Sequence, residues 1–149
     1  MTYFLLLVHV AATWYMVGLC WLVQRVQYPL MAQVGRAGFA DYEAAHVARI
    51  GPIVAPPMVI ELATGLLLLS SNETEFRHPS FLIALGLLAA IWVSTFALQV
   101  PLHGKLAAGF DPDTHASLVS TNWLRTIAWT ARGLLVGWLT WRLAMVGRA

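Results

Sequence analysis

Ten polar or ionisable side chains of this sequence fall in the same half of a predicted helical bundle whose remaining residues are mostly apolar. They are Gln24, Gln27, His46, Arg49, Glu61, Gln99, His103, Asn122, Arg125 and Arg132. Polar groups inside a bilayer are costly unless they pair with one another or line a wet cavity. The cluster therefore predicts a polar pocket near one face of the protein, with groups that could exchange a proton, hold an anion or orient a ligand.

Glu61 is the carboxylate that lies deepest in this cluster. It stands about 12 Å inside the predicted second span if that span begins near Ile53, given the helical rise per residue. A lone carboxylate at that depth needs a partner, and two interpretations stay open. Glu61 forms a structural ion pair with Arg125 or Arg132, or it serves as a proton acceptor or substrate anchor.

The third and fourth predicted spans each carry a polar stripe. Gln99 and His103 are four residues apart and therefore share one helix face. Asn122, Arg125 and Trp129 lie within about 60° of one another around the last helix. We expect Glu61 or His103 to exchange a proton and Arg125 to stabilise negative charge. The expected substrate contacts are Gln99, Asn122, His46 and Trp129.

The remaining histidines give little support for a metal site. No HxxxH or HExxH pair occurs in the chain, and His78 and His115 fall in or beside polar loops, where we expect them to be solvated. A set of His46, His103 and Glu61 would resemble the two-histidine, one-carboxylate arrangement that binds iron. We predict no metal or other cofactor, and this set is the one metal alternative.

The elements that must position these residues are membrane helices. Hydrophobic residues make up 59% of the 149-residue chain, charged residues make up 11%, and the mean hydropathy is +0.69. Soluble domains are about one quarter charged. We therefore predict a single integral membrane domain over residues 1–149, with an all-α fold and spans of about 20 residues each. The predicted spans are 3–26, 52–69, 81–100 and 123–146.

Proline and glycine place the connections between these spans. Gln27-Tyr28-Pro29 is expected to close the first span, Gly51-Pro52 to open the second, and Pro101 to end the third. Residues 30–50 mix charged and apolar side chains, as an interfacial helical segment would. Four spans place both termini on one side of the membrane, with the polar cluster toward the other side.

Charge and cysteine content exclude several functional classes. Nine Lys and Arg residues stand against seven Asp and Glu residues without a basic run, so we expect no nucleic-acid partner. Cys20 is the single cysteine, which leaves no disulfide or CxxC pair within one chain. The expected location is the bacterial inner membrane. The expected partners are the bilayer, a hydrophobic small molecule, and a larger membrane complex or a second copy of the chain.

Two short motifs resemble those of a small four-helix membrane family that includes fungal anthrone oxygenases and many bacterial proteins. Residues 99–107, with sequence QVPLHGKLA, resemble the family's V-P-L-N-x-x-L stretch, and residues 122–126, NWLRT, resemble its N-H-x-R-T. His103 stands where the family usually has asparagine, and Trp123 where it usually has histidine. The resemblance covers most of the chain and implies an oxygenase-like fold, with Asn122 and Arg125 in a pocket between the loops of one side.

Two functions follow as expectations. The first is an oxidoreductase, oxygenase-like, that acts on a hydrophobic aromatic or quinone-like compound in the polar pocket. The alternative is a non-enzymatic accessory subunit of a larger membrane complex, in which the polar groups only link the protein's own helices.

Overall fold

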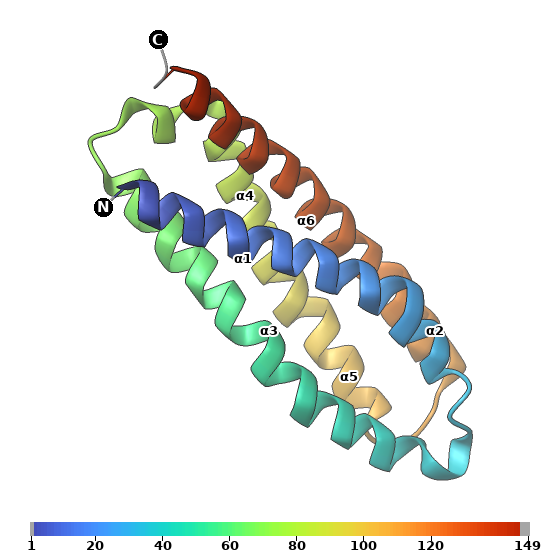
Figure 1. The fold of residues 1–149 in the computed structure, drawn as a ribbon. Helices are drawn as coiled ribbons and strands as arrows, with labels where there is room; N and C mark the ends of the chain where they lie inside the picture. Colours follow the sequence, from blue (N-terminus) through green and yellow to red (C-terminus); the bar gives the residue numbers. More distant parts are fainter. Residues whose placement is uncertain (1, 147–149) are drawn as a thin grey trace.

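The computed structural model describes residues 2–146, and it is a bundle of four long helices without a strand in that range. The first helix is built from α1 (Thr2–Leu22), the π-helical turn η1 (Val23–Gln27) and α2 (Tyr28–Met31). The third is built from α4 (Pro79–Ser94), the π-helical turn η4 (Thr95–Gln99) and α5 (Val100–Leu106). The second is α3 (Phe39–Ser70) and the fourth is α6 (Pro112–Val146). The predicted all-α, four-helix architecture is confirmed (Figure 1).

The four helices form two hairpins that pack side by side. α1 packs against α3, α4 packs against α6, and α1 and α6 join the two hairpins. Short 3-10 turns, η2 (Arg36–Gly38) and η3 (Thr74–Arg77), lie in the first two connections. Thr2 and Val146 lie at the same end of the bundle, as the even number of helices requires (Figure 1).

Three of the helices are long and apolar enough to cross a membrane: Thr2–Met31, Arg36–Ser70 and Pro79–Leu106. α6 is not among them. Its sequence carries arginines that lower its mean hydropathy, and two of these, Arg125 and Arg132, are buried inside the bundle.

Pro29 and Pro101 do not end their helices, contrary to the sequence expectation. Each follows a π-helical turn, in which the backbone N–H of Tyr28 reaches the carbonyl of Val23 and that of Val100 reaches the carbonyl of Thr95. Proline has no N–H and clashes with the carbonyl four residues earlier in a regular helix. The wider π turn changes the hydrogen-bonding register just before each proline, so the chain continues as helix to Met31 and to Leu106.

The predicted interfacial segment is also different in the structure. Residues 39–50 are the first part of α3, which runs on through Pro52, Pro56 and Pro57 to Ser70 without interruption. The second helix therefore begins at Phe39 rather than at Pro52. Membrane helices tolerate internal proline because packing and local adjustment satisfy the freed carbonyls. As a result, α3 carries Glu43 and His46 on the same helix as Glu61.

Apolar clusters hold the bundle together at three levels. Leu6, Leu68, Phe76, Phe81 and Leu139 pack at the end where the chain begins. Met16, Val17, Cys20, Met58, Leu88, Ile91 and Trp129 fill the middle. Val23, Tyr28, Met31, Phe39, Leu106 and Leu118 close the opposite end. The site described below lies between the middle cluster and this closing cluster.

α6 begins at Pro112, well before residue 123, where the predicted fourth span starts. The Asp111 carboxylate accepts a hydrogen bond of 2.8 Å from the backbone N–H of Thr114, as a helix-capping residue does. Hydrogen bonding with Thr114 holds the pKa of Asp111 below its usual range. This cap fixes the register from which Asn122 and Arg125 point into the bundle.

Candidate functional site

The interior of the bundle contains two separate polar clusters. The inner cluster consists of His9, Thr13, Glu61, Thr64 and Arg132. The cavity cluster lies nearer the closed end and consists of Tyr28, Glu43, His46, Gln99, His103, Asn122 and Arg125. The sequence predicts a single polar cluster, whereas the structure divides the buried polar side chains between these two clusters.

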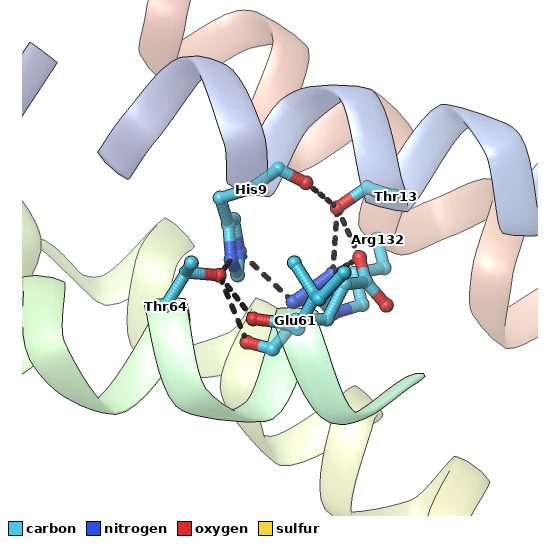
Figure 2. A network of polar contacts seen from close by, with 6 residues as sticks. His9, Thr13, Glu61, Thr64 and Arg132 are labelled. Atoms are coloured by element: carbon cyan, nitrogen blue, oxygen red, sulfur yellow. Dashed lines mark hydrogen bonds and ion pairs between the residues drawn. The ribbon is translucent and has the colours of Figure 1, made fainter. Parts of the chain in front are cut away.

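The inner cluster is built around an ion pair between α3 and α6. Arg132 donates from Nη1 to Glu61 Oε1 over 2.8 Å and to Thr13 Oγ1 over 3.0 Å. Its Nη2 donates to His9 Nε2 over 2.9 Å, so His9 donates from Nδ1 to Thr64 Oγ1 over 2.8 Å. The Thr13 hydroxyl also contacts Glu61. The five side chains thus link α1, α3 and α6 (Figure 2).

This inner cluster is closed on every side. Glu61, Arg132, His9 and Thr13 are fully buried, and none of them lines the cavity. Gly65 makes room for the imidazole, because a Cβ there would lie 3.2 Å from His9 Cε1 and 2.8 Å from a methyl of Leu85. Within the described part of the chain, Glu61 Oε2 and Arg132 Nε have no hydrogen-bond partner, but the two opposite charges are paired with each other. We interpret this buried pair as a structural link.

The cavity cluster faces open space instead. A cavity of about 750 Å³ lies between the two hairpins, within the usual range for small-molecule sites. Most of its wall is apolar and includes Met16 and Met58 in the middle of the bundle. Its polar groups gather toward the end closed by Tyr28 and Leu106.

A carboxylate, an imidazole and a phenol form a chain at this polar end. His103 Nδ1 lies 2.5 Å from Glu43 Oε1, and His103 Nε2 lies 3.1 Å from the hydroxyl of Tyr28. The Glu43 carboxylate is fully buried. A carboxylate that accepts from one ring nitrogen orients the imidazole and leaves the other nitrogen to exchange a proton. The arrangement can therefore pass a proton between the cavity and His103.

A second imidazole and an amide extend the polar wall. The His46 ring stacks on Tyr42, with ring centroids 6.4 Å apart, and its centroid lies 5.4 Å from that of His103. His46 Nδ1 contacts the side-chain amide of Gln27. Gln99 donates to Thr121 Oγ1 over 3.0 Å, which holds its carbonyl oxygen in place.

Arg125 is held by amides rather than by a carboxylate. Its Nη1 donates to Asn122 Oδ1 over 3.3 Å, and Asn122 in turn donates to Gln24 Oε1 over 2.8 Å. Within residues 2–146, the ion pairs are those of Glu43 with His103 and of Glu61 with Arg132, so Arg125 has no carboxylate partner there. A buried cation beside a cavity without a counter-charge attracts an anionic or carbonyl group.

Several buried polar atoms of the cavity wall lack a hydrogen-bond partner. Glu43 Oε2 and Gln99 Oε1 are acceptors, whereas Arg125 Nε and Trp92 Nε1 are donors. Each of these four residues lines the cavity. Buried polar groups are normally paired, so a ligand with one donor and one acceptor would complement one acceptor and one donor of this wall.

The structure brings together five of the seven predicted site residues. His46, Gln99, His103, Asn122 and Arg125 all line the cavity. Glu61 and Trp129 do not. Glu61 belongs to the inner cluster, and Trp129 is fully buried in the middle apolar cluster, with its ring centroid 5.7 Å from the guanidinium carbon of Arg132. Glu61 lies about one helical turn beyond Met58 along α3. Trp129 packs with Met16 and Met58 in the middle apolar cluster, where the two methionines rather than the tryptophan line the cavity.

Other sequence expectations are corrected in the same way. Arg132 does not line the pocket, because it forms the ion pair with Glu61 that was one of the two interpretations, and it is fully buried. His115 is buried rather than solvated, and its Nε2 donates to the backbone carbonyl of Tyr28 over 2.8 Å. His78 is partly buried and caps α4 by accepting from the backbone N–H of Ser80. Arg49 is exposed on α3 and does not line the cavity.

Sequence reasoning missed Glu43 and Tyr28. A signal for Glu43 was present in its spacing from His46, since Glu-x-x-His places both side chains on one face of a helix. The signal for Tyr28 was the pattern Gln-x-Pro-Leu, which occurs at Gln27 and again at Gln99. In both copies a π turn ends at the glutamine and brings the following residues to the cavity.

Two further expectations from the sequence concern a metal site and a resemblance to a known family. Among residues 2–146, no group of three His, Cys, Asp or Glu side chains is arranged to hold a metal ion, and Glu61 lies in a different cluster from His46 and His103. No protein-family model, no curated protein sequence and no solved structure matches the chain.

Proposed function

We propose that the protein binds a hydrophobic aromatic or quinone-like molecule in the cavity and exchanges a proton with it through His103. The observation that carries this proposal is Arg125, a cation that is 8% exposed, lines the cavity and has no carboxylate partner within residues 2–146. Retaining such a cation is costly unless another group shares its charge. A ligand carbonyl or phenolate oxygen would supply that group.

The apolar wall supports the aromatic class of ligand. Trp92 and Phe96 stack with ring centroids 5.7 Å apart and an interplanar angle of 26°, and both line the cavity. Their rings offer a flat surface to an aromatic ligand. Gln99 and Asn122 would orient the polar substituents of that ligand, as the sequence predicts.

The proton chemistry centres on His103 rather than on Glu61. Glu43 orients the imidazole, and Tyr28 lies within hydrogen-bond reach of Nε2. His103 would take a proton from an acidic group of the ligand, and Arg125 would stabilise the resulting anion. An oxygenase-like oxidation of that anion, with molecular oxygen as the oxidant, is the reaction that the family resemblance implies.

We further propose that α6 is the fourth membrane span and that the protein is a multi-pass protein of the bacterial inner membrane. The outer face of α6 is apolar, with Leu124, Ile127, Leu134 and Trp141 all more than half exposed. Arg125 lines the cavity and Arg132 contacts Glu61 of α3, so these two buried arginines would not meet lipid. A helix with this distribution can lie in a bilayer despite its low mean hydropathy.

The rival function, an accessory subunit of a larger membrane complex, is favoured by one feature. The inner cluster is self-contained, as polar groups that only hold helices together would be. That interpretation gives the cavity no role. It predicts co-purification with a partner and no ligand binding by the isolated protein.

Binding of para-hydroxyphenyl decyl ketone, which has one hydroxyl, one carbonyl, an aromatic ring and an alkyl chain, tests the proposal. The tritiated ketone would be measured against protein in nanodiscs by scintillation proximity. Arg125→Met should lower the affinity by about 10- to 100-fold, as expected for losing a hydrogen bond to a charged group. Arg142→Met, which alters an arginine outside the cavity, is the matched control. Equal affinities in both variants, or no binding by the unaltered protein, would reject the proposal.

A further inference from the structure

The wall of the cavity is not equally buried on all sides. The residues contributed by α1 and α6, such as Met16, Cys20 and Asn122, are almost completely buried. On the opposite side, lining residues of α3 and of the η4–α5 region are exposed on the outer surface, including Val47 at 46%, Phe96 at 60% and Val100 at 52%. The cavity therefore reaches the surface between α3 and the helix formed by α4, η4 and α5.

The two sides of this opening are apolar, and small residues are common in them. α3 contributes Ala44, Ala48, Gly51 and Ala55, which follow one another at spacings of three or four residues and all line the cavity. Facing them are Phe96, Val100, Gly104 and Ala107. A Cβ added at Gly51 or Gly104 would have no atom within 4 Å. Both glycines therefore border open space.

The opening runs from the end of the bundle at Ala44 and Ala107 to Ala55 and Phe96 in its interior. All of these residues except Ala107 belong to the helices Arg36–Ser70 and Pro79–Leu106, which are long and apolar enough to cross a membrane. At the end of the bundle, the contact between Glu43 and His103 joins α3 to α5, and Tyr28, Phe39 and Leu106 pack across it. These contacts obstruct access from that end, whereas Val47, Phe96 and Val100 along the opening are exposed.

We propose that the cavity opens sideways into the bilayer between α3 and the η4–α5 region, and that its ligand enters there as a membrane-dissolved amphiphile. Its polar ring would reach Gln99, His103 and Arg125, and its alkyl chain would extend toward Met16 and Met58. This assignment of the ligand class depends on the proposed function, whereas the opening itself does not. From Glu43 to Met58 the lining of α3 runs for about 22 Å at the helical rise, which suits an elongated molecule.

Cys20 allows the opening to be tested without any ligand. It is the sole cysteine, it is 3% exposed, and it lines the cavity. In proteoliposomes, a lipid-soluble alkyl maleimide should label Cys20, whereas a charged, membrane-impermeant maleimide should not. Gly51→Leu and Gly104→Leu should each slow the labelling by at least tenfold. Gly86→Leu is the matched control, because Gly86 has the same free space around it but does not line the cavity.

Association of the tritiated para-hydroxyphenyl decyl ketone gives the second measurement. Gly51→Leu should slow both association and dissociation, because it narrows the route more than it alters the bound state. Three results would overturn the sideways opening. They are equal labelling of Cys20 by both reagents, no labelling by the alkyl maleimide, and an unchanged labelling rate in both leucine variants. Labelling as expected without ketone binding would leave the opening in place and reject the proposed function. A partner protein or second copy that covers the opening would protect Cys20 from the alkyl reagent, and this would also overturn the proposal.

Discussion

The inner cluster and the cavity cluster contain the same kinds of side chain in opposite situations. Each has a buried glutamate, a histidine and an arginine. In the inner cluster the arginine contacts the glutamate and the histidine, and none of the three lines the cavity. In the cavity cluster the glutamate pairs with His103, whereas Arg125 faces the cavity without a carboxylate. Polar residues at depth thus indicate a polar interior. An arginine that lines a cavity and has no carboxylate partner among residues 2–146 distinguishes the candidate site from the structural link.

Removing the inner arginine should give the largest effect on stability. Arg132→Met leaves the Glu61 carboxylate buried without its partner, so the free energy of unfolding should fall by about 3–5 kcal/mol. Chemical unfolding in mixed micelles measures this change. Arg125→Met is the comparison in the cavity and should cost much less, because no carboxylate is left alone. The double variant Glu61→Gln, Arg132→Met should recover most of the lost free energy of unfolding. A larger loss in Arg125→Met than in Arg132→Met would contradict the difference between the two clusters.

A smaller effect is expected when a hydroxyl is removed from the inner cluster. Thr13→Val keeps the shape of the side chain but removes contacts to Glu61 and Arg132, which should lower the free energy of unfolding by about 1–3 kcal/mol. Gln99→Leu is the counterpart in the cavity, where one amide oxygen has no partner to lose. The variant also removes the hydrogen bond from Gln99 to Thr121, but the Thr121 hydroxyl keeps its bond to the carbonyl of Ser117. Gln99→Leu should therefore change the stability less than Thr13→Val does, and it should weaken binding of the ketone. Matching losses of stability in both variants would contradict the distinction.

The smallest predicted change tests packing around the two clusters. Gly65→Ala places a methyl 2.8 Å from Leu85 and 3.2 Å from His9, so it should destabilise the protein by about 1–2 kcal/mol through overpacking. Gly104→Ala meets no atom within 4 Å and removes a flexible residue from a helix, so it should be neutral or slightly stabilising. Thermal unfolding in detergent compares the two. Equal melting temperatures would mean that the inner cluster is less tightly packed than its geometry indicates.

The four helices could be predicted from apolar run lengths, but their ends could not. Proline marked the expected ends of the first and third helices, yet Pro29 and Pro101 follow π turns that accommodate them. Because proline is also expected to mark a helix boundary at Pro52, the sequence predicts a separate segment over residues 30–50. In the structure, α3 continues through three prolines. Local rules fail here because the cost of an internal proline depends on backbone adjustment and packing.

The polar residues of the site could be predicted from depth and helix face, whereas their grouping could not. Glu61 and Arg125 appeared to belong to one set because both lie in polar stripes of their helices. Rotation of one helix against another decides which stripes meet, and it placed Arg132 rather than Arg125 beside Glu61. Glu43 was missed because its segment was assigned to the interface. A carboxylate on a continuous α3 can reach His103 from the neighbouring hairpin.

The most direct test compares Glu61→Gln with Glu43→Gln in nanodiscs prepared in the same way. The free energy of unfolding and the affinity for the ketone are measured for both variants. Glu61→Gln leaves Arg132 unpaired and should lower the free energy of unfolding by about 3–5 kcal/mol. The folded variant should bind the ketone with unchanged affinity. Glu43→Gln keeps a hydrogen bond to His103 and should leave stability within about 1 kcal/mol, but it should weaken binding by about tenfold. A Glu43→Gln variant that loses stability and keeps its affinity, or a Glu61→Gln variant that keeps its stability and loses its affinity, would contradict the account.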